Sequence, residues 1–367
     1  MMINERIHSD LAIPPGEYLE EIIDSLGMSK DELAKRMSRP AAKLSAIFSG
    51  DKAITPETAL QLERVVNVPA HIWTGLESEY RLIIARQTEA EEEEQLKSQV
   101  HLLKDYCYAA LAKAEYVVKK TKPIDKVHEL LSFFGVTSLE NIPQIKRYQV
   151  AFRSSQSQKH QRSPEALIAW LRIGEIAASK TQCRPFDRVG LRALIPEIRE
   201  LTLQPPEEFI PKLEAMLIDV GVVLVLCAHL PKTYAHGATF WQGSNKAVVM
   251  LSLRGAWADI FWFSLLHELG HLLIHGKKDV FIDGRVSMKD NETAEQEADQ
   301  FASDALIPKI HFQSFVFDRE FYAEDIKEFA NRLGIHPGIV VGRLKHRKLI
   351  DQKWHNGLRE RYEFTNC

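Results

Sequence analysis

The sequence lacks the features that anchor a protein in a membrane or export it. No apolar run approaches about 18 consecutive residues, and the opening MMINERIHSD has no basic-then-apolar signal pattern. Cysteines are also few: Cys107, Cys183, Cys227 and Cys367 lie far apart and form no C-x-x-C pair. This spacing is typical of unpaired thiols in a reducing compartment and argues against disulfides or a thiolate metal site. We therefore expect a cytoplasmic protein with no membrane partner.

The chain also lacks a strong excess of charge of either sign. Its formal charge of −3 argues against a protein that binds polyanions indiscriminately, so any nucleic-acid contact must depend on a local patch. With 367 residues, of which 45% are hydrophobic, the chain is long enough to form two or three compact units.

Residues 1–85 carry closely spaced signals for the starts and ends of helices. Ser29 and Glu32 form a capping box, Thr55-Pro56 begins a further helix, and Asn67 ends it. Several short helices in so little chain predict a small all-α domain. Residues 86–205 alternate helical periodicity with proline and glycine breaks, which predicts a helical connector.

The pattern changes after residue 206. The β-branched content of Gly221–Leu226 and Lys246–Leu253 predicts two buried strands, and Gly237–Gln242 alternates well enough to be a third. A long apolar helix is expected from Asp259 to His275.

That long helix contains the sequence His267-Glu268-Leu269-Gly270-His271. Histidines four residues apart project from one face of a helix, so both imidazoles can reach one zinc ion. Glu268 lies about 100° around the helix from His267 and can take a proton from a water molecule without binding the metal. Zinc lowers the pKa of such a water to roughly 7. The motif therefore predicts His267 and His271 as ligands of Zn²⁺ and Glu268 as the catalytic base.

A catalytic zinc site needs a third protein ligand, and the helix expected over Asn291–Ile307 offers three glutamates. Glu295 shares a face with two alanines that allow this helix to approach the first one closely, so we expect Glu295 to be the ligand. Glu292 and Glu297 remain alternatives. Asp299, one turn beyond Glu295, can accept a hydrogen bond from a ligand histidine and fix its tautomer.

Together these patterns predict the fold class α+β. An all-α head over residues 1–85, which the resemblance given below implies is a helix-turn-helix domain, precedes the helical middle over 86–205. A zinc-binding core with a small β-sheet and an active-site helix follows over 206–320, and a helical extension over 321–367 ends the chain. The resemblance given below implies that this core is a zincin-like metallopeptidase.

We expect a peptide substrate to pair with an exposed strand edge, because a peptidase of this kind needs an extended chain. Ala238–Gln242 is the candidate edge, since it is short and glycines bracket it. Its Phe240 and Trp241 would face opposite sides of the sheet.

The stretch Trp257–Pro308, with HELGHLLIHG followed by ETAEQEADQFASDALIP, resembles the ImmA/IrrE family of metallopeptidases. The final LIP is one residue shorter than the usual family spacing, and Gly334–Leu344 also looks like the tail of longer members. Carried over by position, the resemblance supports the two histidine ligands, Glu268 as base and Glu295 as the carboxylate ligand. It implies a regulatory protease whose substrate is a helix-turn-helix repressor.

The segment MSRPAAKLSAIFSGDKAITPETALQLE resembles the antitoxin-type helix-turn-helix of the HigA family. Ser38 replaces the usual turn glycine, and we expect it to cap the second helix. The resemblance implies operator DNA or a toxin protein as partners, and a homodimer formed through this domain.

DNA binding by this head depends on a small group of basic residues around the helix that Pro40 is expected to start. The candidate contacts are Lys35, Arg36, Arg39, Lys43 and Lys52. Residues 1–80 nevertheless hold eight basic and thirteen acidic side chains, and the second helix offers few groups that read bases. The head is therefore either a phosphate-contacting module with modest sequence readout or a protein-binding, dimerising module.

Two functions remain in competition. The first is a zinc-dependent regulatory endopeptidase with a DNA- or repressor-binding head. The alternative is a transcriptional repressor or antitoxin whose zinc domain senses metal or binds a partner. Glu268 favours catalysis, because a purely structural zinc site closes its fourth position and needs no base.

Overall fold

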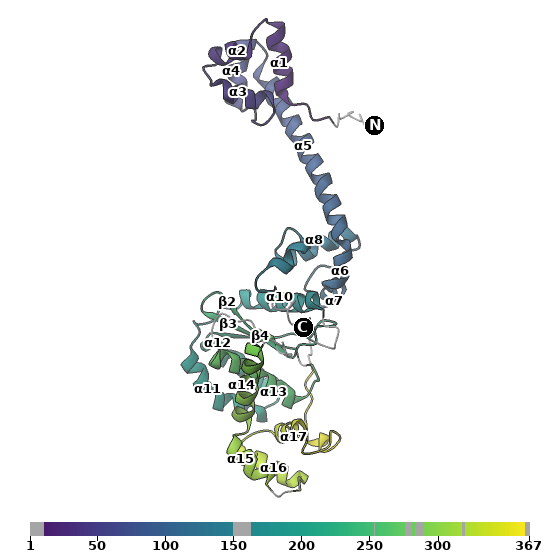
Figure 1. Cartoon of the computed structure of the whole chain (residues 1–367), viewed down its shortest axis with the longest axis vertical. Coiled ribbons are helices and arrows are strands. Elements are labelled where there is room, and N and C mark those ends of the chain that lie inside the picture. Colours follow the sequence, from purple (N-terminus) through teal and green to yellow (C-terminus); the bar gives the residue numbers. More distant parts are fainter. Residues whose placement is uncertain are drawn as a thin grey trace. The chain divides into compact units, whose positions relative to one another are not determined.

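The computed structural model describes residues 11–149, 163–252, 254–275, 281–282, 289–317 and 320–363. For residues 89, 90, 92, 281, 282 and 289–292 it describes the backbone alone. The chain divides into two compact units, Met1–Ser98 and Gln99–Cys367 (Figure 1). The finer four-part division stays a prediction.

The first unit is helical throughout its described part. The capping signals act as predicted: the Ser29 hydroxyl accepts a hydrogen bond from the backbone N–H of Glu32, Thr55 caps in the same way, and Asn67 ends its helix in the left-handed conformation. The helices are α1 (Pro15–Ser25), α2 (Lys30–Arg36), α3 (Ala41–Phe48), α4 (Pro56–Val66) and α5 (Ala70–Ser98).

The core of this unit holds α2 and α3 in a helix-turn-helix arrangement. Leu33 of α2 and Leu44 and Ile47 of α3 are buried in one apolar cluster with Trp73. The expectation that Ser38 caps α3 is wrong. The tight reversal between the helices requires a residue with positive φ, and Ser38 supplies it at φ 52°, while α3 begins after Pro40 without a side-chain cap.

The second unit begins with helices that lie before the sheet in sequence. They are α6 (Leu102–Asp105), α7 (Tyr108–Lys113), α8 (Pro123–Phe134), α10 (Pro164–Lys180), α11 (Arg188–Glu200) and α12 (Pro206–Asp219). After the third strand come α13 (Ala258–Ile274), α14 (Lys289–Leu306), α15 (Lys309–Val316), α16 (Ala323–Leu333) and α17 (Pro337–His346). Short 3-10 turns lie at Gln99–His101, Leu139–Gln144, Leu201–Leu203 and Asn356–Leu358.

A small mixed sheet forms the centre of this unit. Its strands are β1 (Val222–Leu226), β2 (Gly237–Gln242), β3 (Lys246–Leu251) and β4 (Phe281–Ile282), in the order β1-β3-β2-β4. β1 runs parallel to β3, whereas β2 runs antiparallel to β3 and β4. Helix α10 contacts one face and α13 the other, with α14 beyond α13 (Figure 1). The predicted α+β class is therefore confirmed.

The expectation that Ala238–Gln242 is an open edge is wrong for its first half. Ala238 pairs with Ile282 and Thr239 with Phe281, so β4 covers that part of β2. Beyond β4, the carbonyl of Trp241 accepts a hydrogen bond of 2.9 Å from the guanidinium of Arg147. A substrate strand therefore cannot pair along the whole of β2 in this arrangement.

Helix α13 is held at both ends by arginines from other elements. Asp259 in its first turn receives two hydrogen bonds of 2.9 Å from Arg359, and the carbonyl of Leu273 in its last turn accepts one of 2.9 Å from Arg188. Cations near the last carbonyls of a helix complement its dipole. The pair His267 and His271 thus lies in a helix whose two ends are fixed.

Gly270 allows α14 to lie close against α13. A Cβ atom at this position would be 3.0 Å from the Phe301 ring and 3.4 Å from the Cα of Ala298. The predicted alanines, Ala298 and Ala302, are both fully buried. Small residues on both helices therefore bring the carboxylates of α14 within reach of the histidines of α13.

Two remaining observations concern the whole chain. Cys107, Cys183 and Cys227 are free thiols, and Cys367 lies outside the described residues. In the part of the chain that the structure describes, no helix combines the length and apolar character needed to cross a membrane.

Candidate metal centre

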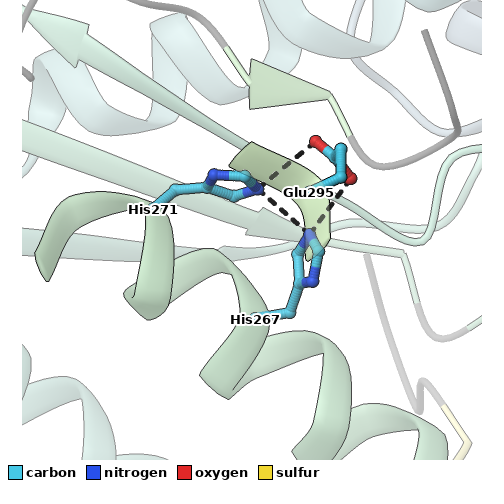
Figure 2. A group of neighbouring side chains, drawn as sticks. All are labelled: His267, His271 and Glu295. Atoms are coloured by element: carbon cyan, nitrogen blue, oxygen red, sulfur yellow. Dashed lines mark hydrogen bonds and ion pairs between the residues drawn. The ribbon is translucent and has the colours of Figure 1, made fainter. Parts of the chain in front are cut away.

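Two imidazoles from α13 form the first half of the site. His267 and His271 are 3% and 1% exposed, and their Nε2 atoms are 3.0 Å apart (Figure 2). This convergence follows from the four-residue spacing, which places both side chains on one helix face. Two buried nitrogen atoms at this separation can both bind one metal ion.

Glu295 completes the cluster from α14. Its Oε2 lies 3.4 Å from Nε2 of His267, and its Oε1 lies 3.4 Å from Nε2 of His271 (Figure 2). One ligand atom from each of the three residues lies within 4.8 Å of the others. Tetrahedral zinc with bonds of about 2.0–2.1 Å separates neighbouring ligand atoms by roughly 3.3 Å. The spacing and the donor types therefore fit zinc.

The pKa shifts of Glu295 and His271 are in the direction that favours their metal-binding forms. Burial alone would raise the pKa of Glu295, but hydrogen bonds from His267 and His271 outweigh it and lower the pKa to about 2. Burial also lowers the pKa of His271. A carboxylate and a neutral imidazole are the forms that bind metal.

Asp299 lies behind the first histidine. Its Oδ1 is 2.9 Å from Nδ1 of His267, the nitrogen that faces away from the cluster. A proton on Nδ1 donated to this carboxylate leaves the lone pair of Nε2 directed at the cluster. The orienting role of Asp299 stays a prediction.

The alternative ligands lie elsewhere. Glu297 is on another face of α14, where its half-exposed carboxylate lies 3.7 Å from Nδ1 of His275. The Nε2 of His275 is 3.1 Å from the carbonyl oxygen of Ala294, so this histidine ties the end of α13 to α14. The side chain of Glu292 lies outside the described part of the chain.

Glu268 faces the sheet, whereas the two histidines face α14. Its side chain is fully buried, and its Oε2 accepts a hydrogen bond of 2.6 Å from the hydroxyl of Thr239 in β2. A Cβ atom at Gly237 would lie 2.4 Å from Oε1 of Glu268, so glycine there leaves room for the carboxylate. The sequence reasoning missed this role of Thr239. Strand alternation, which turns Thr239 toward α13, is the signal that would have found it.

The candidate DNA contacts all belong to the helix-turn-helix, but their side chains differ. Lys35, Lys43 and Lys52 are exposed. Arg36 forms an ion pair with Glu32, and the Nε of Arg39 donates to Gln61 at 2.6 Å. Four of the five side chains, those of Lys35, Arg36, Lys43 and Lys52, are therefore exposed, and Arg36 and the partly buried Arg39 already have partners within the head.

The fold and the site define a candidate metalloprotein with a two-histidine, one-carboxylate cluster and a separate helix-turn-helix domain. The family model described as the IrrE N-terminal-like domain (peptidase M78) matches residues 223–345, which include the whole cluster. The C-terminal part of the chain therefore carries a domain that matches this family model, and its N-terminal part is a helix-turn-helix domain similar to two relatives, one of them an HTH-type transcriptional regulator. The resemblances found in the sequence are thus confirmed.

The relatives of the N-terminal part are short proteins. The uncharacterized HTH-type transcriptional regulator YddM of Escherichia coli is 31% identical over 74 residues, which are 20% of this chain and 79% of that protein. Virulence-associated protein I of Dichelobacter nodosus is 35% identical over 77 residues, 21% of this chain and 71% of that protein. A solved addiction module antidote protein of the HigA family from Coxiella burnetii is 32% identical and matches 23% of this chain and 91% of its own, with a TM-score of 0.21.

Proposed function

We propose that this chain is a zinc-dependent regulatory endopeptidase that cleaves a helix-turn-helix repressor. The observation that carries the proposal is the convergence of His267, His271 and Glu295, with the buried Glu268 next to His267 in the same helix. Three protein ligands leave a fourth position for a water molecule or the substrate, as in catalytic zinc sites. Membership in a peptidase family supports the same reading.

Glu268, Thr239 and Asp299 each have a separate role in the proposed reaction. A bound zinc ion would polarise the scissile carbonyl and make a water molecule acidic enough to react near neutral pH. Glu268 is the residue that would take up a proton from the attacking water and give it to the departing amine nitrogen. Thr239 holds one oxygen of the Glu268 carboxylate, which restricts its rotation. Asp299 keeps His267 in the tautomer that presents Nε2 to the metal.

The helix-turn-helix head supplies the regulatory half of the proposal. It binds operator DNA or the repressor itself, and a homodimer through this domain is compatible with either. The exposed lysines Lys35, Lys43 and Lys52 support contacts to phosphate, because phosphate contacts need charge and no base-reading groups.

A cleavage experiment tests the proposal. Zinc-loaded protein is incubated with the helix-turn-helix repressors encoded beside it, and the products are analysed by mass spectrometry. We expect one discrete cut, and Glu268→Gln should slow it by about 10²–10⁴-fold because the general base is removed. Glu297→Gln, an exposed glutamate on α14, is the matched control and should cleave normally. Cleavage by a zinc-replete Glu268→Gln protein at the normal rate would contradict the mechanism.

The likeness of the head to regulators and antidote proteins favours a second candidate. In this alternative the chain is a repressor or antitoxin that binds operator DNA or a toxin protein, and the zinc domain acts as a sensor or partner-binding module. Zinc-dependent DNA or toxin binding that Glu268→Gln leaves unchanged, with no cleavage of any neighbouring repressor, would establish the alternative.

A further inference from the structure

A cavity of about 150 Å³ lies between α13, α14 and α17, on the helix that carries the histidines. Its walls are mostly apolar and include Ile260, Phe263, Leu306, Ile307 and Ile339. A cavity of this size lined by such side chains holds a molecule on the order of benzene. Phe263 lies one turn before His267, and their ring centroids are 6.3 Å apart. The α17 pocket, as this cavity is called below, is therefore adjacent to the metal centre and separate from it.

Basic side chains from α17 and the residue after it line the same pocket. Arg343, His346 and Arg347 contribute to its wall, and the last two are exposed at the surface. One acidic residue, Asp259, also lines it, but two hydrogen bonds from Arg359 already neutralise that carboxylate. The charge that the pocket presents to a ligand is thus positive.

Arg343 is a buried cation with incomplete compensation. Its side chain is 9% exposed, and its nearest recorded carboxylate is Asp304 at 3.8 Å. Its NH1 donates to the carbonyl of Ser303 at 2.8 Å and to that of Ile307, and its guanidinium lies 4.2 Å from the centroid of the Phe312 ring. Its Nε has no hydrogen-bond partner among the described residues. Burial lowers the pKa of Arg343 to about 10. A desolvated cation of this kind is stabilised by an anion nearby.

We propose that the α17 pocket binds a small carboxylate that carries an apolar group about the size of a phenyl ring. The apolar group lies against Ile260, Phe263 and Ile339, and the carboxylate lies at the surface beside Arg347 and His346. Mostly apolar pockets with a few placed polar groups are the usual form of small-molecule sites. Arginine pairs with carboxylate in a two-point geometry, which makes it suited to this ligand. The same chemistry exists in a free organic acid and in the C-terminus of a peptide that ends in an aromatic residue.

Binding of 3-phenylpropionate to the full chain tests the proposal, with the neutral 3-phenylpropionamide as the matched ligand. Titration followed by protein NMR or calorimetry measures both affinities. We expect the acid to bind about tenfold more tightly than the amide, as a charge-assisted contact provides. Equal affinities, or no saturable binding of the acid, would overturn the proposal.

Two neighbouring cations provide the protein controls. Arg347→Gln should lower the affinity for the acid about fivefold and leave that for the amide unchanged. Lys348→Gln removes an exposed charge that does not line the pocket, and should change neither affinity. Equal losses in the two variants would mean that bulk positive charge attracts the acid, which would overturn the site.

A filling variant locates the ligand. Ser303 lines the pocket from α14, and Ser303→Leu should abolish binding of both ligands while thermal unfolding confirms that the chain is folded. Undiminished binding in a folded Ser303→Leu protein would place the ligand elsewhere. A short peptide that ends in Phe with a free carboxylate is then tested as a competitor of 3-phenylpropionate. If the peptide displaces the acid, the natural ligand is a peptide C-terminus. If the acid binds and the peptide does not displace it, the natural ligand is a free organic acid.

Discussion

The metal centre and the helix-turn-helix head use charged side chains in opposite ways. At the centre His267, His271 and Glu295 come from two packed helices, and all three are largely buried with their donor atoms 3.0–3.4 Å apart. In the head Lys35, Lys43 and Lys52 are exposed and separate. Buried donors at fixed spacing can hold one ion, whereas exposed cations act on a polyanion through summed and salt-screened attraction.

This difference predicts how each region responds to substitution. Removing one group at the centre breaks a geometry that the other groups cannot replace, so the effect should be large. Removing one exposed cation from the head subtracts one contact among several, so the effect should be modest and depend on salt.

Among the residues that support the ligands and the base without being one of them, the largest effect is expected at Asp299. Asp299→Asn should weaken zinc binding about 10–100-fold, because the amide no longer fixes His267 in the tautomer that presents Nε2. Competition with a zinc chelator measures the affinity, and Glu297→Gln on the same helix is the control. Equal zinc affinity in wild type and Asp299→Asn would show that the 2.9 Å contact does not orient the ligand.

A smaller effect is expected at Thr239, which contacts the base and not the metal ligands. Thr239→Val should lower kcat about tenfold with little change in KM, since a hydrogen bond to a charged group contributes about 1.5 kcal/mol. Thr239→Ser keeps the hydroxyl and should restore most of the rate. Both variants should retain zinc. If serine is as slow as valine, the hydroxyl has no positioning role and the loss comes from packing.

The smallest effect is expected in the head, and it should sort the candidate contacts. In the full chain, Lys43→Ala should lower the affinity for DNA a few-fold. It should also reduce the slope of log affinity against log salt concentration by about 1. Arg36→Ala should change both less, because Glu32 already neutralises Arg36. Fluorescence anisotropy over a range of salt concentrations measures this. No DNA affinity even at low salt would make the head a protein-recognition module.

Much of the fold could be predicted because local signals agreed with the final packing. The helix caps at Ser29, Thr55 and Asn67, the short strand β2 with its bracketing glycines, and the apolar character of α13 all depend on neighbouring residues. The close approach of α14 to α13 could be predicted from the alanines of α14. The contribution of Gly270 in α13 was not predicted. Glu295 could be favoured over Glu297 because the helical period places them on different faces.

Two of the three misjudged features depend on residues that are distant in the sequence, and the third depends on a local backbone conformation. The partial cover of β2 by β4 depends on a two-residue strand with no pattern of its own, so nothing in the sequence excluded an open edge. The contact between Thr239 and Glu268 joins residues 29 positions apart. Ser38 was assigned a side-chain role because the sequence shows residue types, whereas its actual part is a backbone conformation.

The zinc content of the purified full chain tests the central claim most directly. Elemental analysis should find one zinc ion per chain in wild type and in Glu268→Gln, because Glu268 lies on the sheet side of α13 and is not a ligand. His267→Ala and Glu295→Ala should lose the metal, since each removes a ligand from a three-residue set. Undiminished zinc in either of these two variants would contradict the proposed centre.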